Sequence, residues 1–299
     1  MGLPVGHSGW RYFYYTFEYL RMPLFAAISG YVYSKRPAGD SKILTFYKGK
    51  ARRILLPLIF VGTVHFLLQY FVPGTNSTPR LSDIWKIFFT AYEHFYFLQS
   101  TFLIFLFIGI IDHLKLMLSL RNWLIIFLLA AMTRNLIPHF YPNVFSINGF
   151  FSLLPFFILG CGINRFPGLF TLKAFIKPVG ILFILAIFLQ QYIWFSGSVM
   201  SHLEIETLSI FVGFSGIIIL SYIRKDIPIM SRIGYYSFGI YLFHVFGTAG
   251  SRILLSKFDI GNNVIVFTIG LLFGILIPIV IELNLEKSKI TRRLFLGLR

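Results

Sequence analysis

Residues 263–281 read "NVIVFTIGLLFGILIPIVI", nineteen residues without a charged side chain. A helix rises about 1.5 Å per residue, so a stretch of this length reaches across the roughly 30 Å hydrocarbon core of a bilayer. The remaining sequence is similar: the chain is 57% hydrophobic and 13% charged, with a mean hydropathy of +0.77. Soluble domains are about a quarter charged. The stretch and the composition together predict a membrane protein.

Spans of about 20 mostly apolar residues recur along the whole chain, separated by polar or Gly- and Pro-containing breaks. The aromatic content of 19%, with 36 Phe, suits helices that face lipid. We therefore predict an all-α, polytopic transmembrane helix bundle in which residues 1–299 form a single integral-membrane domain. The nine expected spans lie near residues 15–33, 54–72, 95–112, 122–138, 147–164, 178–196, 206–223, 233–251 and 263–281.

The net charge of +16 in a soluble protein would suggest nucleic acid, but the basic residues are placed differently. Of the 27 Lys and Arg, 20 lie in alternate loops and in the C-terminal tail, the densest loop being residues 34–53. Basic loops face the cytoplasm. The alternation predicts that this loop and the C-terminus are cytoplasmic and that residues 73–85 lie outside, and we expect no nucleic-acid partner.

This orientation places the segment before Tyr15 outside, although residues 1–9 are too short to cross the membrane. We therefore expect a missing upstream stretch that would complete one more helix ending near His7. The single Cys161 excludes an intramolecular disulfide and a cysteine-based zinc site.

Ionisable groups at membrane depth cost about 2.5–3.5 kcal/mol each on insertion scales, so each is a candidate functional residue. His65 and His202 are the weaker candidates. The stronger ones are His7, Glu18, Arg21, Glu93, His94 and His244.

Four further patterns each allow two interpretations. Ser237, Tyr241 and His244 share one helix face, which fits a polar cavity or a helix-to-helix hydrogen bond. Glu18 and Arg21, three apart, fit a buried site or an interfacial ion pair.

A basic cluster, "KGKARR" at residues 48–53, fits either the binding of cofactor phosphates or a topology signal. "YEHFYFLQS" at residues 92–100 combines aromatic rings with Glu93 and His94, which suits stacking a sugar and bonding its hydroxyls, although aromatic belts are also common at interfaces. The chain contains no His-Glu-x-x-His, Walker loop or Gly-x-Ser-x-Gly, so no metal site is predicted.

Five motifs follow one another in order along the chain: Gly6-His7-Ser8, Met22-Pro23-Leu24-Phe25 with Ser29-Gly30-Tyr31, Lys50 to Arg53 before Pro57, His94 to Leu98, and Gly234, Ser237, Tyr241, Leu242 and His244. Together they resemble the acyltransferase-3 family of membrane acyltransferases over essentially the whole chain. Lys50 stands where that family has an arginine, and this change keeps the charge but loses the planar fork.

The resemblance implies an O-acyltransferase that moves an acyl group, by default acetyl, from cytoplasmic acyl-CoA to a hydroxyl of an extracytoplasmic or lipid-linked glycan. It implies His7 as catalytic base or transient acyl acceptor, with Glu18, Arg21 and His244 shaping the site. Lys50, Arg52 and Arg53 would bind the donor, which is a substrate, so we expect no permanently bound cofactor. Glu93, His94, Tyr96, Ser237 and Tyr241 would bind the acceptor.

The implied location is a bacterial cytoplasmic membrane, in a polysaccharide biosynthesis pathway. Two alternatives remain open: a transporter or flippase for lipid-linked saccharides, and a non-catalytic scaffold in an envelope polysaccharide complex. A flippase would not depend on acyl-CoA. The sequence leaves the acyl group, the acceptor and the oligomeric state undetermined.

Overall fold

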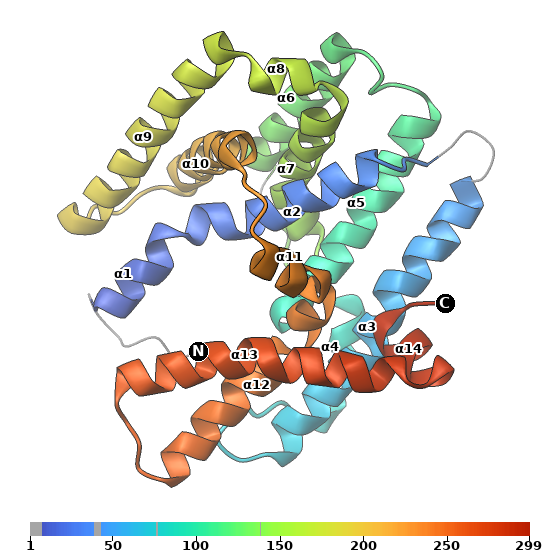
Figure 1. Ribbon diagram of the computed structural model, residues 1–299, viewed down its shortest axis with the longest axis vertical. Coiled ribbons are helices and arrows are strands. Elements are labelled where there is room, and N and C mark those ends of the chain that lie inside the picture. Colours follow the sequence, from blue (N-terminus) through green and yellow to red (C-terminus); the bar gives the residue numbers. More distant parts are fainter. Residues whose placement is uncertain (1–7, 39–42, 76, 138) are drawn as a thin grey trace. The chain divides into compact units, whose positions relative to one another are not determined.

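The computed structural model describes residues 8–38, 43–75, 77–137 and 139–299 (Figure 1). Every regular element in these ranges is a helix, which confirms the all-α prediction. In chain order they are α1 Gly9–Thr16, α2 Glu18–Ser34, α3 Ile43–Phe71, the 3-10 turn η1 Leu81–Asp83, α4 Lys86–Phe89, the 3-10 turn η2 Glu93–Phe95, α5 Tyr96–His113, α6 Leu120–Leu136, α7 Ile147–Arg165, α8 Pro167–Thr171, α9 Lys173–Ser196, α10 His202–Ile223, α11 Pro228–Tyr235, α12 Ser237–Lys257, α13 Asn263–Glu286 and α14 Lys289–Leu296.

Seven helical segments in the described residues are long and apolar enough to cross a membrane: α3, Glu93–His113, α7, α9, α10, α12 and α13. Helices α2 and α6 have 17 residues each, the short end of the range that spans a bilayer. Each of the nine expected spans falls on one of these helices. The multi-pass bundle is confirmed, and the number of nine spans stays a prediction.

Two expected spans begin later than the sequence suggests. The first span is interrupted at Phe17, where φ is −103° and ψ is 3°, so α1 ends and α2 begins at Glu18. The eighth is interrupted in the same way at Tyr236, with φ −91° and ψ 11°, so the long helix begins at Ser237 rather than at residue 233. The backbone departs from helical geometry at each of these single residues, and a hydropathy pattern does not reveal such a departure.

The chain divides into two compact units. Among the described residues, unit 1 contains 48–75, 77–102 and 226–299, and unit 2 contains 8–38, 43–47, 103–137 and 139–225.

Unit 2 is organised around the close packing of α2 on α7, on which α6 and α10 also pack. A Cβ at Gly30 would collide with the Phe157 carbonyl, and a Cβ at Gly160 would collide with the Ala27 carbonyl. Small residues let two backbones approach in this way where the surroundings are as apolar as the helices. The neighbouring Cys161 thiol donates to the Gly30 carbonyl at 3.3 Å, so the lone cysteine is part of this contact.

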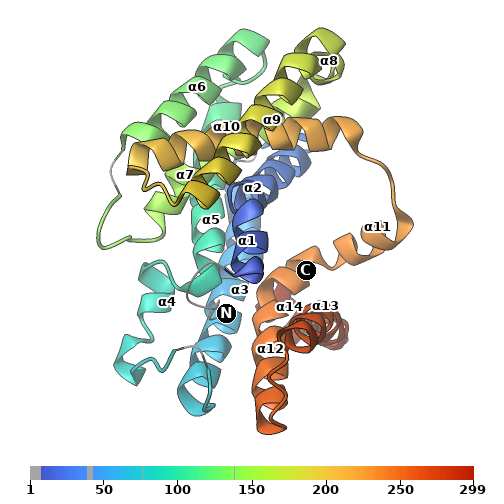
Figure 2. The same ribbon diagram turned by 90° about the vertical axis from the view of Figure 1, so that its left-hand side faces the viewer.

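Unit 1 is built on α12 and α13, which run side by side (Figure 1). Gly247 allows the close approach, because a Cβ there would meet the Phe273 carbonyl. The short α14 packs against α13 (Figure 2). The Arg52 Nε of α3 donates to the Gly297 carbonyl at 3.2 Å, which joins the C-terminal tail to the start of this unit.

The α2–α7 contact generates a stability prediction. Gly160→Val places a side chain against the Ala27 carbonyl. We expect the free energy of unfolding to fall by about 1–3 kcal/mol, the usual cost of overpacking. Thermal unfolding of the detergent-solubilised protein measures it. Gly168→Ala is the matched control, because a Cβ at Gly168 meets no atom within 4 Å. Equal unfolding temperatures for Gly160→Val and the wild type would contradict the packing.

Candidate functional site

Three histidines from distant parts of the sequence meet in unit 1. His65 lies on α3, His94 in η2 and His244 on α12. The His94 ring lies 5.6 Å from the His65 ring and 5.0 Å from the His244 ring, measured between centroids, and both pairs are edge-on. We call these residues the histidine cluster. Two of the three, His94 and His244, were predicted site residues.

Hydrogen bonds fix two of these imidazoles. The Tyr241 hydroxyl donates to the His94 carbonyl at 2.6 Å, so α12 holds the turn that carries His94. The His244 Nδ1 lies 2.9 Å from the Tyr241 carbonyl and 3.2 Å from the Ile240 carbonyl. A ring nitrogen so close to carbonyl oxygens carries the hydrogen and donates it, which leaves the His244 Nε2 lone pair free to accept a proton.

Two nitrogens of the histidine cluster have no hydrogen-bond partner within the described residues: Nδ1 of His65 and Nε2 of His94, both buried. Burying a polar group without a partner costs free energy, so such groups in a native site call for an explanation. A substrate or water that bonds to them would supply one. The cluster therefore has the features of a binding or catalytic centre.

A second layer of polar residues adjoins the histidine cluster. The Tyr92 hydroxyl donates to the Gln69 Oε1, and the Gln69 Nε2 donates to the Glu93 carboxylate at 3.4 Å. Glu93 has a positive φ of 44°, an uncommon backbone conformation for this residue type. Burial, and then the Glu93 carboxylate, raise the pKa of the Tyr92 hydroxyl, so Tyr92 stays neutral and keeps its donated hydrogen.

Glu282 places an ionisable group inside unit 1, on α13. Its residue is 7% exposed, and its Oε2 has no hydrogen-bond partner in the described part of the chain. A Cβ at Gly239 would collide with this carboxylate, so the glycine is needed for α12 and α13 to enclose it. A buried carboxylate oxygen without a partner is costly and marks a functional candidate.

The predicted acceptor residues are partly assembled. Glu93, His94 and Tyr241 lie together with His244 through the contacts above. Ser237 is exposed at the first position of α12, and Tyr96 is half-buried at the start of α5. The predicted shared face of α12 is present for Tyr241 and His244, both of which contact His94.

The other predicted catalytic residues belong to unit 2 or fall outside the described residues. Glu18 and Arg21 belong to unit 2, where the Arg21 guanidinium donates to the Tyr14 hydroxyl at 2.7 Å and lies over its ring. The pair that these two residues could form is absent from the described ion pairs. His7 lies outside the described residues.

The basic cluster of residues 48–53 lies on α3. Arg52 is half-buried and bonds to Gly297, whereas Arg53 is exposed. Gly297 has a φ of +64°, and a Cβ there would meet the Arg53 backbone, so the tail approaches α3 closely. The tail helix α14 carries Arg292 and Arg293, which adds positive charge to this part of unit 1.

Sequence reasoning undervalued His65 and missed Gln69 and Glu282. His65 and Gln69 are four residues apart on one otherwise apolar helix, and this i, i+4 pattern could have indicated a shared polar face. Glu282 sits at the end of the most apolar stretch, where it reads as the start of the C-terminal tail.

Comparison with known proteins adds the family. The model of the acyltransferase-3 family, described as an acyltransferase domain, matches residues 2–283. Searches of curated proteins and of solved structures found no match. The family match covers nearly the whole chain, including the histidine cluster, the basic cluster and the two glycine-mediated helix contacts. The resemblance seen in the motifs is thereby confirmed: this chain belongs to the acyltransferase-3 family and is a membrane acyltransferase.

Proposed function

We propose that this acyltransferase moves an acyl group, acetyl first among the candidates, from cytoplasmic acyl-CoA to a hydroxyl of an extracytoplasmic or lipid-linked glycan. The observation that carries the proposal is the histidine cluster of a chain in an acyltransferase family, with two buried ring nitrogens that lack partners in the described residues. Imidazole is the side chain best suited to take a proton from a hydroxyl near neutral pH.

The reaction needs a base, a donor site and an acceptor site. A histidine nitrogen takes the proton of the acceptor hydroxyl, whose oxygen bonds to the thioester carbonyl carbon. The C–S bond breaks, and the CoA sulfur leaves and receives a proton. We assign the base, or a transient acyl acceptor, to His7, and we assign a supporting role to His244 because its Nδ1 donates to backbone carbonyls and so leaves the lone pair on Nε2. Glu18 and Arg21 remain proposed site residues.

The donor site is the basic cluster. CoA carries phosphates, which Arg binds through charge-assisted and often bidentate hydrogen bonds. Lys50, Arg52 and Arg53 lie on one helix, and α14 brings Arg292 and Arg293 into the same unit. The contact between Arg52 and Gly297 supports a donor site that includes the tail.

Contacts within each unit support the proposed orientation. In unit 2, Asp112 pairs with Arg165 at 2.6 Å and accepts from Tyr33 at 2.7 Å, so three segments assigned to the cytoplasmic side meet. His139 and His202, from two segments assigned to the opposite side, also meet each other.

Unit 1 follows the same pattern. Arg52 contacts the tail, both assigned to the cytoplasm. Arg252 donates to the Gly74 carbonyl at 3.0 Å, and both residues are assigned to the outside. These contacts group the loops by side as the charge alternation assigns them, and the positive-inside rule then supports a cytoplasmic C-terminus in the proposed cell membrane.

The catalytic assignment gives the first test of function. His7→Ala should lower O-acylation of the cell-surface glycan at least about hundredfold, because a positioned general base contributes about 10²–10⁴-fold. O-acyl content of cells expressing the chain, normalised to its membrane abundance, measures this. His113→Ala, at the exposed end of α5, is the control and should leave O-acylation unchanged. Wild-type O-acyl content with His7→Ala would remove His7 from the mechanism.

The donor assignment gives a second test. Exchanging both Arg52 and Arg53 for Gln should raise the KM for acyl-CoA at least about tenfold, because hydrogen bonds to charged groups contribute about 1.5–3 kcal/mol. Steady-state CoA release measures KM and kcat. The control exchanges Lys173 and Lys177, both exposed on α9, for Gln. The single variant Arg53→Gln keeps the Arg52 contact with the tail, so it separates the loss of charge from the loss of that contact. An unchanged KM in both variants would reduce the cluster to a topology signal.

A further inference from the structure

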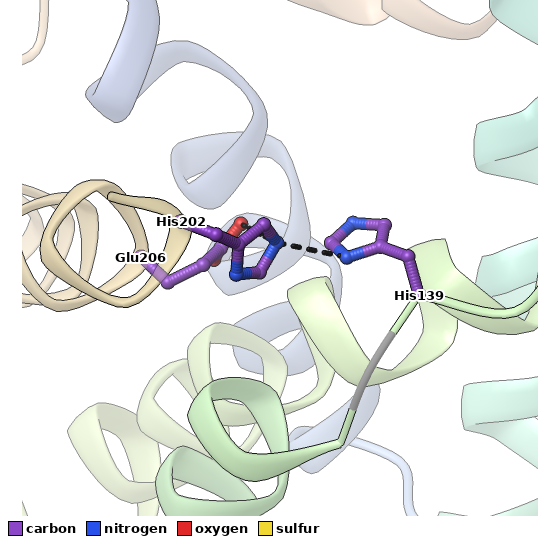
Figure 3. A group of neighbouring side chains, drawn as sticks. All are labelled: His139, His202 and Glu206. Atoms are coloured by element: carbon purple, nitrogen blue, oxygen red, sulfur yellow. Dashed lines mark hydrogen bonds and ion pairs between the residues drawn. The ribbon is translucent and has the colours of Figure 1, made fainter. Parts of the chain in front are cut away.

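A second group of histidines lies in unit 2, outside the site described above. His139 follows α6, and His202 and Glu206 lie on the first turns of α10 (Figure 3). One ligand atom from each residue lies within 4.8 Å of the others. The His202 Nε2 and the His139 Nδ1 are 2.8 Å apart, and the His202 Nε2 is 4.0 Å from the Glu206 Oε1. We call these residues the second histidine group.

Local structure holds the two α10 residues in place. Ser201 caps α10 in a capping box with Glu204, which fixes His202 at the first helical position. Residues four apart share one helix face, so Glu206 lies beneath His202. His139 approaches from the segment between α6 and α7, and its ring points at the His202 ring (Figure 3).

A buried ion pair orients the carboxylate. The Arg134 Nη2 lies 2.6 Å from the Glu206 Oε2, and their side chains are 9% and 14% exposed. Arg134 also donates to the Ser209 hydroxyl at 2.7 Å and to the Ser152 carbonyl. The ion pair holds Glu206 through Oε2, and Oε1 lies 4.0 Å from the His202 Nε2.

The geometry fits a divalent transition metal. Zn²⁺ binds imidazole nitrogen at about 2.0–2.1 Å and carboxylate oxygen at about 2.0–2.2 Å, so two nitrogens in a tetrahedral site lie roughly 3.3 Å apart. The imidazole nitrogens here are 2.8 Å apart, and the Glu206 Oε1 is 4.0 Å from the His202 Nε2. Small rotations of the two exposed rings and of the carboxylate would bring the three ligand atoms to the separations of a zinc site. Two nitrogens and one oxygen suit Zn²⁺, whereas Ca²⁺ and Mg²⁺ prefer oxygen ligands alone.

Proton placement also permits a metal. Two facing ring nitrogens in the metal-free protein share one hydrogen, donated by one ring to the other. Each ring can instead carry its hydrogen on its second nitrogen, which leaves two lone pairs for the ion. No net proton is lost from two neutral imidazoles, so binding needs only a change of tautomer.

We propose that His139, His202 and Glu206 bind one Zn²⁺ ion, which ties the start of α10 to the segment between α6 and α7. Three protein ligands leave a fourth position for water. Arg134 acts as a positioning residue: it holds the far oxygen of Glu206 and keeps the carboxylate directed at the ion. The ion would join two segments 63 residues apart in the sequence.

The test is a titration of the full chain, purified in detergent without a histidine tag, with ZnCl₂. Calorimetry should show one saturable site, and Zn²⁺ should raise the unfolding temperature of the wild type. His139→Ala and His202→Ala should each weaken binding at least about tenfold, because losing even a second-shell partner costs about 10–100-fold. Co²⁺ in place of Zn²⁺ should give a visible absorption spectrum that both variants lose.

His113→Ala is the matched control, an exposed histidine of the same unit outside the group, and should bind Zn²⁺ like the wild type. Carbethoxylation of the wild type, mapped by mass spectrometry, provides a readout that needs no variant: Zn²⁺ should protect His139 and His202 but not His113. The proposal is wrong if the wild type shows no saturable site, if both alanine variants bind unchanged, or if protection fails. Zn²⁺ binding that His113→Ala also removes would place the ion elsewhere.

Discussion

Polar groups buried among apolar helices have no water to bond with, and this constraint organises both units of the protein. Asp112 is matched by Arg165 and Tyr33, and Glu206 by Arg134, so these charges are neutralised where they are enclosed. In such pairs each buried polar group has a hydrogen-bond or ionic partner, and the pair connects the two chain segments that carry it. Groups that stay unmatched are different, because nothing in the fold accounts for their cost.

Three of the unmatched polar atoms in the described part of unit 1 belong to its helices α3 and α13 and to the turn η2. Nδ1 of His65 and Nε2 of His94 lie in the histidine cluster, and Glu282 is enclosed where α12 passes α13 at Gly239. A bundle that only had to be stable would fill these positions with apolar side chains. The proposed function assigns these groups a role: they would form hydrogen bonds with hydroxyl and carbonyl groups of the substrates.

Hydropathy predicted the membrane bundle because very few backbone structures can span a lipid bilayer. Each expected span contains a helix. The breaks at Phe17 and Tyr236 escaped it, since they depend on one backbone conformation inside apolar sequence. Arg165, read as a topology signal, also pairs with Asp112, which a count of charges by loop does not reveal. Both groups of histidines depend on tertiary contacts between distant segments. The i, i+4 spacing joins His202 to Glu206, but no spacing rule joins His139 to them or His65 to His94 and His244.

The central claim is that acyl groups pass from a donor on one side of the membrane to an acceptor on the other. The most direct test uses proteoliposomes that enclose the glycan acceptor. Acyl-CoA labelled in its acyl group is added outside. Protease digestion identifies the vesicles in which the C-terminal tail of the protein faces outward. The account predicts that the label appears on the enclosed glycan in these vesicles and not in protein-free ones. Label found only on acceptor supplied on the donor's side, or no transfer at all, would contradict it.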